Sequence, residues 1–317
     1  MSSSSSSSSS PSIIPKKIFI VPYRAREKHL IFFRIYMKYL MEDEAPGSYR
    51  VVFSHQTDTH PFNRGAVKNI GFLAMKKEYP NHYKDITFVF NDIDTLPHKK
   101  GLLPYDTTHG VIKHFYGFTF ALGGIFSIKG GDFEKVNGFP NYWGWGMEDN
   151  VIYQRALHMG LKVDRSVFFS WKNNNMNILQ FESGLQRLIS RSNSYKSKQD
   201  VSDPQTKSGL NTIKPNRLFY GPRVDQDENF FIDIRQFETE LDPSEENFEQ
   251  QNLMLKGGRL RVHHPIKERF RNMQLLNDPH RGKVNRNNIN KSSNKANNTI
   301  VKRGKNRTKN YGMNFLR

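Results

Sequence analysis

The sequence contains no cysteine among its 317 residues. Disulfide bonds and thiolate metal sites are therefore excluded, and a secreted domain held together by disulfides is not expected. The sequence also has no apolar run of about 18 residues that would span a bilayer, and its N-terminal serine tract has no hydrophobic signal core. We therefore expect an unsecreted cytoplasmic protein without a transmembrane segment.

Acidic residues are missing from the C-terminal end of the chain. From Arg281 to Arg317 there are eleven lysines and arginines and no acidic residue, whereas residues 1–280 hold 37 basic and 30 acidic residues. The net charge of +18 therefore lies mainly in this tail. Its composition is typical of a disordered segment that binds nucleic acid or another anionic surface weakly, or of a solvated appendage.

Large apolar residues are also scarce at the N-terminus, where nine consecutive serines predict a disordered tail over residues 1–14. Between the two tails, residues 15–280 are long enough for one domain with a substantial core. We predict that the basic segment 281–317 is a second disordered tail.

Strands and helices alternate in the first third of this domain. Short apolar runs predict strands, and apolar residues at helical spacing predict helices. The predicted elements are strands at 18–21, 51–53 and 86–90 and helices at 26–42 and 63–78. Such alternation predicts an α/β domain with a mainly parallel sheet covered by helices on both faces.

The later part of the chain is less regular. It predicts a helix at 151–161, a helix at 178–189 and a strand at 230–234, and the acidic segment 238–251 is expected to be exposed.

Two acids separated by one residue, Asp92 and Asp94, follow the third predicted strand. Ligands bind beyond the carboxyl ends of the strands in such sheets, and carboxylates suit Mg²⁺ or Mn²⁺ bridging a diphosphate. The same pattern is also typical of a solvated turn or helix cap. Arg24, Arg26 and Arg64 follow earlier strands, where guanidinium groups bind phosphate or make surface salt bridges.

The stretch from Phe139 to Asn150 combines two tryptophans, two interleaved glycines and an acid pair. Trp143 and Trp145 alternate with the glycines, and Glu148 and Asp149 follow at once. Indole rings stack on the apolar faces of sugars, and carboxylates bind their hydroxyls. A core turn whose tryptophans merely pack is the alternative, but the combination favours a sugar site.

These motifs, in their order, resemble those of the β-1,4-galactosyltransferase family, which are inverting enzymes that transfer a sugar from UDP to an acceptor hydroxyl. The matching blocks within residues 17–165 are Pro22–Leu30, Phe62–Arg64 with Asn69–Phe72, Phe90–Asp94, Gly123–Gly124 and Asn137–Asp149. The resemblance implies a GT-A-type, Rossmann-like fold, a UDP-galactose or UDP-N-acetylgalactosamine donor, a saccharide acceptor, and Mn²⁺ or Mg²⁺.

The resemblance also implies roles for individual residues. The donor would lie against Pro22, Arg24, Arg26, Phe62, Arg64, Asp92, Gly124 and Trp145. Asp94 would bind the metal. Glu148 would orient the substrates, and Asp149 would be the general base that takes the proton of the acceptor hydroxyl. Trp145 would lie in a loop that closes over both substrates.

The chain departs from the family at one metal ligand. The family supplies a histidine some 30 residues beyond the acid pair, but residues 173–180 contain none. Met176, His263, His264 or water would have to replace it.

Two further departures concern the substrates. Asn150 stands where the family usually has a third acid, and Ala121 stands where galactose-specific members have tyrosine. The smaller Ala121 leaves room for an N-acetyl group on the donor sugar.

The absence of cysteines and of an anchor favours a microbial or viral enzyme, in the host cytoplasm if viral. A carbohydrate-binding protein without turnover and a nucleic-acid-binding protein acting through its basic tail are the alternatives.

Overall fold

The computed structural model describes residues 13–171, 176–181, 186–190, 192–202, 208–221 and 229–252. Most of the predicted N-terminal tail, the basic tail and the His263–His264 pair lie outside the described residues. The domain boundaries proposed at residues 15 and 280 stay predictions.

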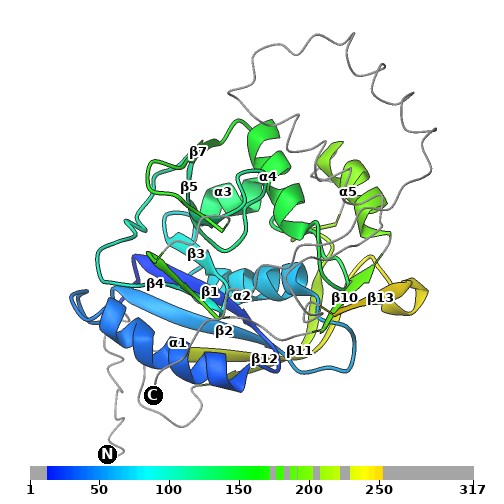
Figure 1. Ribbon diagram of the computed structural model, residues 1–317, viewed down its shortest axis with the longest axis horizontal. Helices are drawn as coiled ribbons and strands as arrows, with labels where there is room; N and C mark the ends of the chain where they lie inside the picture. Colours follow the sequence, from blue (N-terminus) through cyan, green and yellow to red (C-terminus); the bar gives the residue numbers. More distant parts are fainter. Residues whose placement is uncertain are drawn as a thin grey trace, which may run out of the picture. The chain divides into compact units, whose positions relative to one another are not determined.

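The described residues form one large mixed sheet with helices on both faces (Figure 1). The strand order is β11-β12-β2-β1-β3-β6-β5-β7, and β8 also pairs with β5. The strands are β1 (Lys17–Tyr23), β2 (Tyr49–Gln56), β3 (Thr87–Asn91), β5 (Val111–Gly117), β6 (Ile125–Lys129), β7 (Lys162–Asp164), β8 (Phe169–Ser170), β11 (Lys214–Gly221) and β12 (Asn229–Glu238). The four strands β12, β2, β1 and β3 are mutually parallel, whereas β6 and β11 run antiparallel to their neighbours.

Helices and two small sheets complete the described part of the chain. The helices are α1 (Glu27–Leu40), α2 (Arg64–Glu78), α3 (Gly130–Lys135), α4 (Glu148–His158) and α5 (Asn193–Ser202), with a 3₁₀ turn η1 (Pro243–Glu245). The small sheets pair β4 (Thr95–Pro97) with β9 (Ile178–Gln180) and β10 (Gln186–Ser190) with β13 (Phe248–Asn252).

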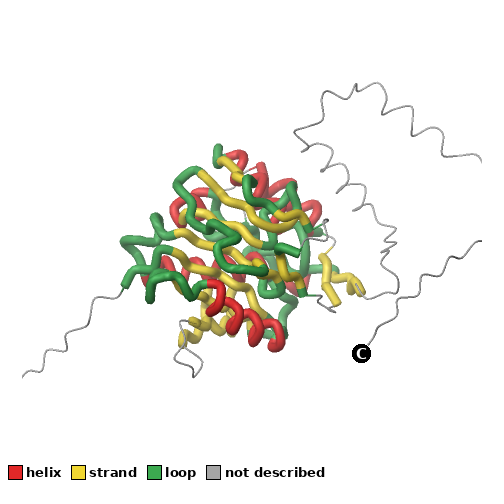
Figure 2. Tube along the Cα trace, turned by 60° about the vertical axis from the view of Figure 1, so that its left-hand side comes forward, coloured by secondary structure: helices red, strands yellow, loops and turns green. Residues whose placement is uncertain are grey.

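Both faces of the sheet are buried, because neighbouring side chains of a strand point to opposite faces. In β1, Ile18 and Ile20 pack into the cluster that also holds residues of α2, α3 and α4. Phe19 and Val21 pack into a second cluster with the buried face of α1. Figure 2 shows the strands side by side between the helices. The predicted α/β fold with a mainly parallel central sheet is confirmed.

The helix predicted at 178–189 is wrong. Ile178–Gln180 is strand β9, hydrogen-bonded to β4, and Gln186–Ser190 is strand β10, paired with β13. Short apolar segments have the same composition in either structure, so pairing with distant strands decides the outcome. The segment 238–251 was expected to be exposed. No residue of 238–248 is buried, and the segment contains η1 and most of β13.

Candidate active site

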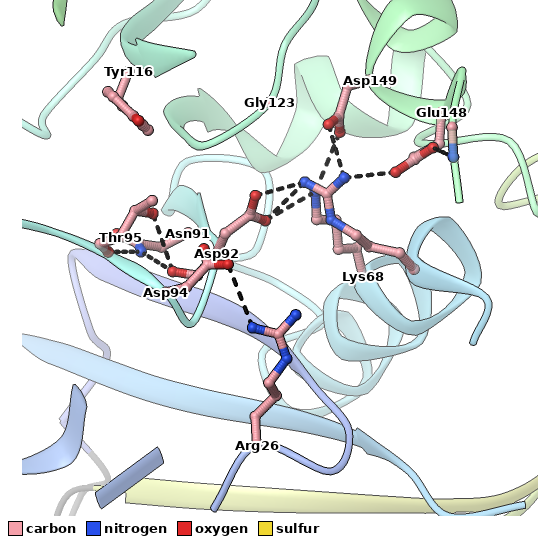
Figure 3. A network of polar contacts seen from close by, with 12 residues as sticks. Arg26, Lys68, Asn91, Asp92, Asp94, Thr95, Tyr116, Gly123, Glu148 and Asp149 are labelled. Atoms are coloured by element: carbon pink, nitrogen blue, oxygen red, sulfur yellow. Dashed lines mark hydrogen bonds and ion pairs between the residues drawn. The ribbon is translucent and has the colours of Figure 1, made fainter. Parts of the chain in front are cut away.

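Charged side chains from four separate segments meet where the central parallel strands end (Figure 3). Arg26 follows β1, the pair Asp92 and Asp94 follows β3, and α2 and α4 each begin at this edge. The structure therefore brings together the acids and two of the three arginines that the sequence singled out.

Arg64, the first residue of α2, lies at the centre of this cluster. Its Nη1 donates to Glu148 Oε1 (2.6 Å) and Asp149 Oδ2 (2.9 Å), and its Nη2 donates to both carboxylate oxygens of Asp92 (2.8 and 2.7 Å). Burial alone would lower the pKa of Arg64, but the three carboxylates together raise it well above its ordinary value. One arginine thus holds three acids from two distant motifs.

A second cation, Lys68, adjoins the same acids. Its Nζ donates to Asp149 Oδ1 (3.3 Å), lies 3.7 Å from Asp92 Oδ1, and sits 4.5 Å from the ring centroid of Phe139. Sequence reasoning missed this residue, although it follows Arg64 by four positions in a predicted helix, a spacing that places two side chains on one face.

Buried asparagines fasten α2 to the stretch that carries the acid pair. Asn63 caps the helix by accepting from Ala66 N (2.9 Å), and its Nδ2 donates to Asn141 O (3.0 Å). Asn69 donates to Phe139 O (2.7 Å) and accepts from Phe139 N (3.0 Å). These bonds fix the start of α2 against residues 139–141, so Arg64 faces the start of α4.

The acid pair occupies the first turn of α4, three residues earlier than the predicted helix start. Glu148 Oε2 accepts from Gly146 N (3.1 Å), and the backbone O of Asp149 accepts from Leu122 N (2.8 Å). Burial, and secondly the charge of Asp149, raises the pKa of Glu148, while Arg64 opposes this rise. Glu148 therefore holds a proton more readily than an ordinary glutamate does.

The glycine pair approaches both acid motifs closely. A Cβ on Gly123 would lie 2.5 Å from Asp149 Oδ2. Gly124 has a φ of +71°, a conformation that other residues rarely adopt, and its carbonyl accepts from Asp92 N (3.0 Å). Gly124, which was predicted to bind the donor, therefore contacts Asp92 through its backbone.

A buried histidine holds this glycine loop in place. Arg165 Nε donates to His114 Nδ1 (3.1 Å), so His114 carries its proton on Nε2, which donates to the carbonyls of Tyr116 (3.0 Å) and Gly123 (3.1 Å). Burial, reinforced by the charge of Arg165, lowers the pKa of His114 to about 3. His114 is thus a neutral structural link beneath the site.

The predicted metal ligand Asp94 lies 3.5 Å from Arg26 Nη1. Within the described residues, no three acidic, histidine or cysteine side chains are grouped to hold a metal ion. Met176 is 89% exposed, and residues 173–175 lie outside the description. Asp94 nevertheless fits a cation of the Mg²⁺ or Mn²⁺ kind, which takes one or two carboxylates and completes its shell with substrate phosphate and water.

The other predicted donor residues flank the cluster. Pro22 is buried in β1, and Phe62 is half-buried against the core. Arg24 donates to Asp58 O (3.0 Å) and His60 O, so its guanidinium group lies against the 58–60 loop. These three residues lie on neighbouring segments and are not among the residues that hydrogen-bond to the Arg64 guanidinium group.

The two tryptophans differ in their surroundings. Trp143 is buried, stacks on Phe237 at 5.2 Å, and donates to Leu241 O (2.8 Å). Trp145 is 37% exposed and is attached through its backbone N to Leu188 O (2.6 Å). Trp143 is therefore a core residue, the alternative raised from the sequence, whereas Trp145 keeps part of its surface exposed.

Asn150 is buried and donates to Phe120 O (3.2 Å). It anchors the loop before the glycine pair. Sequence reasoning also missed an aromatic pair beside this loop, Phe118 and the exposed Trp171, whose ring centroids lie 4.8 Å apart.

Two family models match successive parts of the chain. Residues 10–103 match the N-terminal region of glycosyl transferase group 7, and residues 111–177 match a model described as the N-terminal domain of galactosyltransferase. The chain belongs to the β-1,4-galactosyltransferase family.

The family's animal members are recognisably similar over part of their length. The chain is 30% identical to mouse β-1,4-galactosyltransferase 1 over 163 residues, which are 48% of this chain and 40% of the mouse protein. It is 33% identical to human β-1,4-galactosyltransferase 2 over 157 residues, 46% of this chain and 41% of the human protein. The chain thus matches about two fifths of the length of these curated relatives.

Solved structures of the family share the fold. The catalytic domain of Drosophila β1,4-galactosyltransferase 7 in complex with xylobiose superimposes with a TM-score of 0.56 at 22% identity, covering 73% of this chain and 97% of that chain. A mutant of the same enzyme, in complex with manganese, UDP-Gal and xylobiose, gives a TM-score of 0.54 at 20% identity over the same shares of the two chains. The predicted GT-A-type architecture is confirmed.

The predicted cytoplasmic location is wrong. The curated relatives of this chain are Golgi type II membrane enzymes. Cysteine content and the lack of an apolar run were therefore insufficient grounds for assigning a compartment. Among the helices in the described part of the chain, none has the length and apolar character needed to cross a bilayer.

Proposed function

We propose that the protein is an inverting glycosyltransferase that moves galactose or N-acetylgalactosamine from a UDP-sugar to a saccharide hydroxyl. The observation that carries the proposal is the contact of one arginine, Arg64, whose side chain is only 13% exposed, with Asp92, Glu148 and Asp149. It joins the donor-side and acceptor-side motifs of the family in one cluster at the ligand-binding edge of an α/β sheet.

Asp149 is the proposed general base. It accepts the proton of the acceptor hydroxyl as that oxygen bonds to C1 of the sugar, while the bond from C1 to the diphosphate oxygen breaks and its electron pair leaves with UDP. Its carboxylate is fixed by Arg64 and Lys68 and lies against Gly123. Glu148, with its raised pKa, is suited to hydrogen bonding a sugar hydroxyl from the same helix turn.

Donor binding is proposed for the cationic side of the cluster. Arg26 follows β1, and Arg64 is the first residue of α2. A diphosphate bound here would meet two guanidinium groups and the N-terminus of a helix. Asp94 would hold a divalent cation, which stabilises the negative charge of the departing diphosphate when bound. The Drosophila enzyme crystallised with manganese and UDP-Gal supports this choice of donor and metal.

Trp145 is the proposed sugar-facing side chain of the loop between the core residue Trp143 and the acid pair. Gly144 and Gly146 flank it with φ of +80° and +117°, so the backbone on both sides is in conformations that favour glycine. The half-exposed indole is positioned to cover substrates and to exclude water from the reacting carbon.

The tests begin with the wild-type protein. It is incubated with Mn²⁺, UDP-galactose or UDP-N-acetylgalactosamine and simple saccharide acceptors, and both UDP and the glycosylated product are measured. We expect UDP release that increases with acceptor and a product whose anomeric configuration is inverted. Absence of UDP release from every donor would contradict the proposal.

A carbohydrate-binding protein without turnover is the second candidate. It follows from the sequence, because residues 173–180 lack the histidine that the family uses as a metal ligand. Saccharide binding in calorimetry, together with donor-independent affinity and no UDP release, would favour this candidate over the transferase.

A further inference from the structure

We propose that Lys68 is a positioning residue of the transfer reaction, which holds the Asp149 carboxylate and keeps it ionised when Arg64 engages the donor diphosphate. The inference rests on the proposed function, because it concerns the same base. It adds a cation from the second turn of α2 to a site otherwise built from helix starts and strand ends.

Lys68 is unusually deeply buried for a lysine. Its side chain is 1% exposed, although a lysine ammonium group is strongly hydrated and is almost never fully buried without a partner. Its Nζ is compensated by Asp149 Oδ1 at 3.3 Å, Asp92 Oδ1 at 3.7 Å and the face of Phe139 at 4.5 Å. The ammonium group is therefore confined to the acid cluster, with no exposed side from which to swing into solvent.

Lys68 and Arg64 divide the Asp149 carboxylate between them. Arg64 donates to Oδ2 and Lys68 to Oδ1, so each oxygen has its own cation. The groups that face Asp149 are Arg64 and Lys68 from α2, Glu148 from the same turn of α4, and Asp92 after β3, which is held by both cations. Three carboxylates thus share two cations.

This balance changes when a donor binds. A diphosphate brings further negative charge and competes for Arg64, the proposed donor-binding cation. Asp149 would then face Glu148 and Asp92 with less of the Arg64 charge, which favours the protonated carboxyl form. Lys68 cannot leave, so its charge continues to favour the ionised form that can accept a proton.

The decisive variants remove the charge of Lys68 and keep most of its volume. Lys68→Met is apolar, and Lys68→Gln keeps a hydrogen-bond donor, so either variant is informative if the other does not fold. Lys76→Met is the matched control, because Lys76 lies two turns later on α2 and pairs with Glu134 away from the site.

The readout is the pH dependence of kcat, which reports groups in the enzyme–substrate complex. Loss of an opposite charge within hydrogen-bonding distance raises the pKa of a carboxyl group by about one unit or more. We expect the acid limb of kcat to move to higher pH by about that amount in both Lys68 variants and to stay in place in Lys76→Met. An unchanged acid limb, with activity lowered equally at every pH, would overturn the proposal.

A second measurement does not depend on turnover and separates failure of this inference from failure of the proposed function. Lys68→Met, Asp149→Asn and the double variant are compared with wild type in urea unfolding. We expect non-additive effects, because each single change removes one partner from a charge that the double variant removes altogether. Additive effects would overturn the proposed coupling, whereas a wild-type protein that releases no UDP would overturn the transferase function itself.

Discussion

Replacing Gly123 by alanine tests the placement of the catalytic base without changing any charged group. The added Cβ would lie 2.5 Å from Asp149 Oδ2, whereas an ordinary contact begins at 3.4 Å. The carboxylate oxygen must therefore move away by about 0.9 Å, because it is the end of a side chain whereas the new Cβ is attached to the backbone. Gly123 does not have a positive φ, so alanine is compatible with its backbone.

Displacement of a reacting group by about 1 Å lowers a rate by about 10²-fold, equivalent to about 2.7 kcal/mol of transition-state stabilisation. We therefore expect Gly123→Ala to lose about 10²-fold in kcat/KM for UDP release with acceptor. Stability should change by less than about 1 kcal/mol, since alanine also reduces the entropy of the unfolded chain.

The assay compares initial rates and urea unfolding for wild type, Gly123→Ala and the control Gly131→Ala. A Cβ on Gly131, in the first turn of α3, would meet Lys84 at an ordinary 3.4 Å, so the control should keep full activity. Wild-type activity in Gly123→Ala would refute the close placement of Asp149 against Gly123. A large loss of stability instead would show that the loop, and not the carboxylate, yields.

Two further predictions concern pH and donor choice. The folded-state pKa of His114, about 3, lies below its ordinary value of 6.5, so its contribution to stability is complete above pH 6.5 and declines as the pH falls. At pH 5 the loss is about 2 kcal/mol. His114→Gln should lack this component in urea unfolding measured from pH 7 to 5, and an identical slope would contradict the neutral buried histidine. Ala121→Tyr should shift donor preference from UDP-N-acetylgalactosamine toward UDP-galactose by about tenfold or more, because a bulky side chain removes room for the N-acetyl group. Competition between the two donors measures this ratio, and an unchanged ratio would refute the role of Ala121.

The central fold was predictable because its strands and helices follow from local patterns of apolar residues. Alternating apolar runs and helical spacing are visible in residues 18–90, and each predicted strand and helix there exists within a few residues of its predicted bounds. The close approach of Gly123 and Gly124 to Asp149 and to Tyr116, by contrast, is a tertiary contact that the structure adds. The helix at 178–189 failed because its strands depend on β4 and β13, which lie far away in the sequence.

The acids and Arg64 of the candidate site were visible in the sequence, but Lys68 and the contacts among these residues were not. Asp92 stood out as an acid after a predicted strand, and Glu148 and Asp149 as acids after a stretch of tryptophans and glycines. Their common contact with Arg64 nevertheless depends on the asparagine bonds that fasten α2 to residues 139–141. Those buried polar contacts leave no periodic pattern in a sequence. The different surroundings of Trp143 and Trp145 likewise depend on packing against Phe237, a residue of β12.

Asp149→Asn tests the central claim most directly, because it removes the proposed base and keeps the size of the side chain. A general base contributes about 10²- to 10⁴-fold, so acceptor-dependent UDP release should fall by that factor. Asp85→Asn, which changes an aspartate paired with His109 outside the site, should release UDP at the wild-type rate. Equal UDP release by Asp149→Asn and wild type would contradict the account.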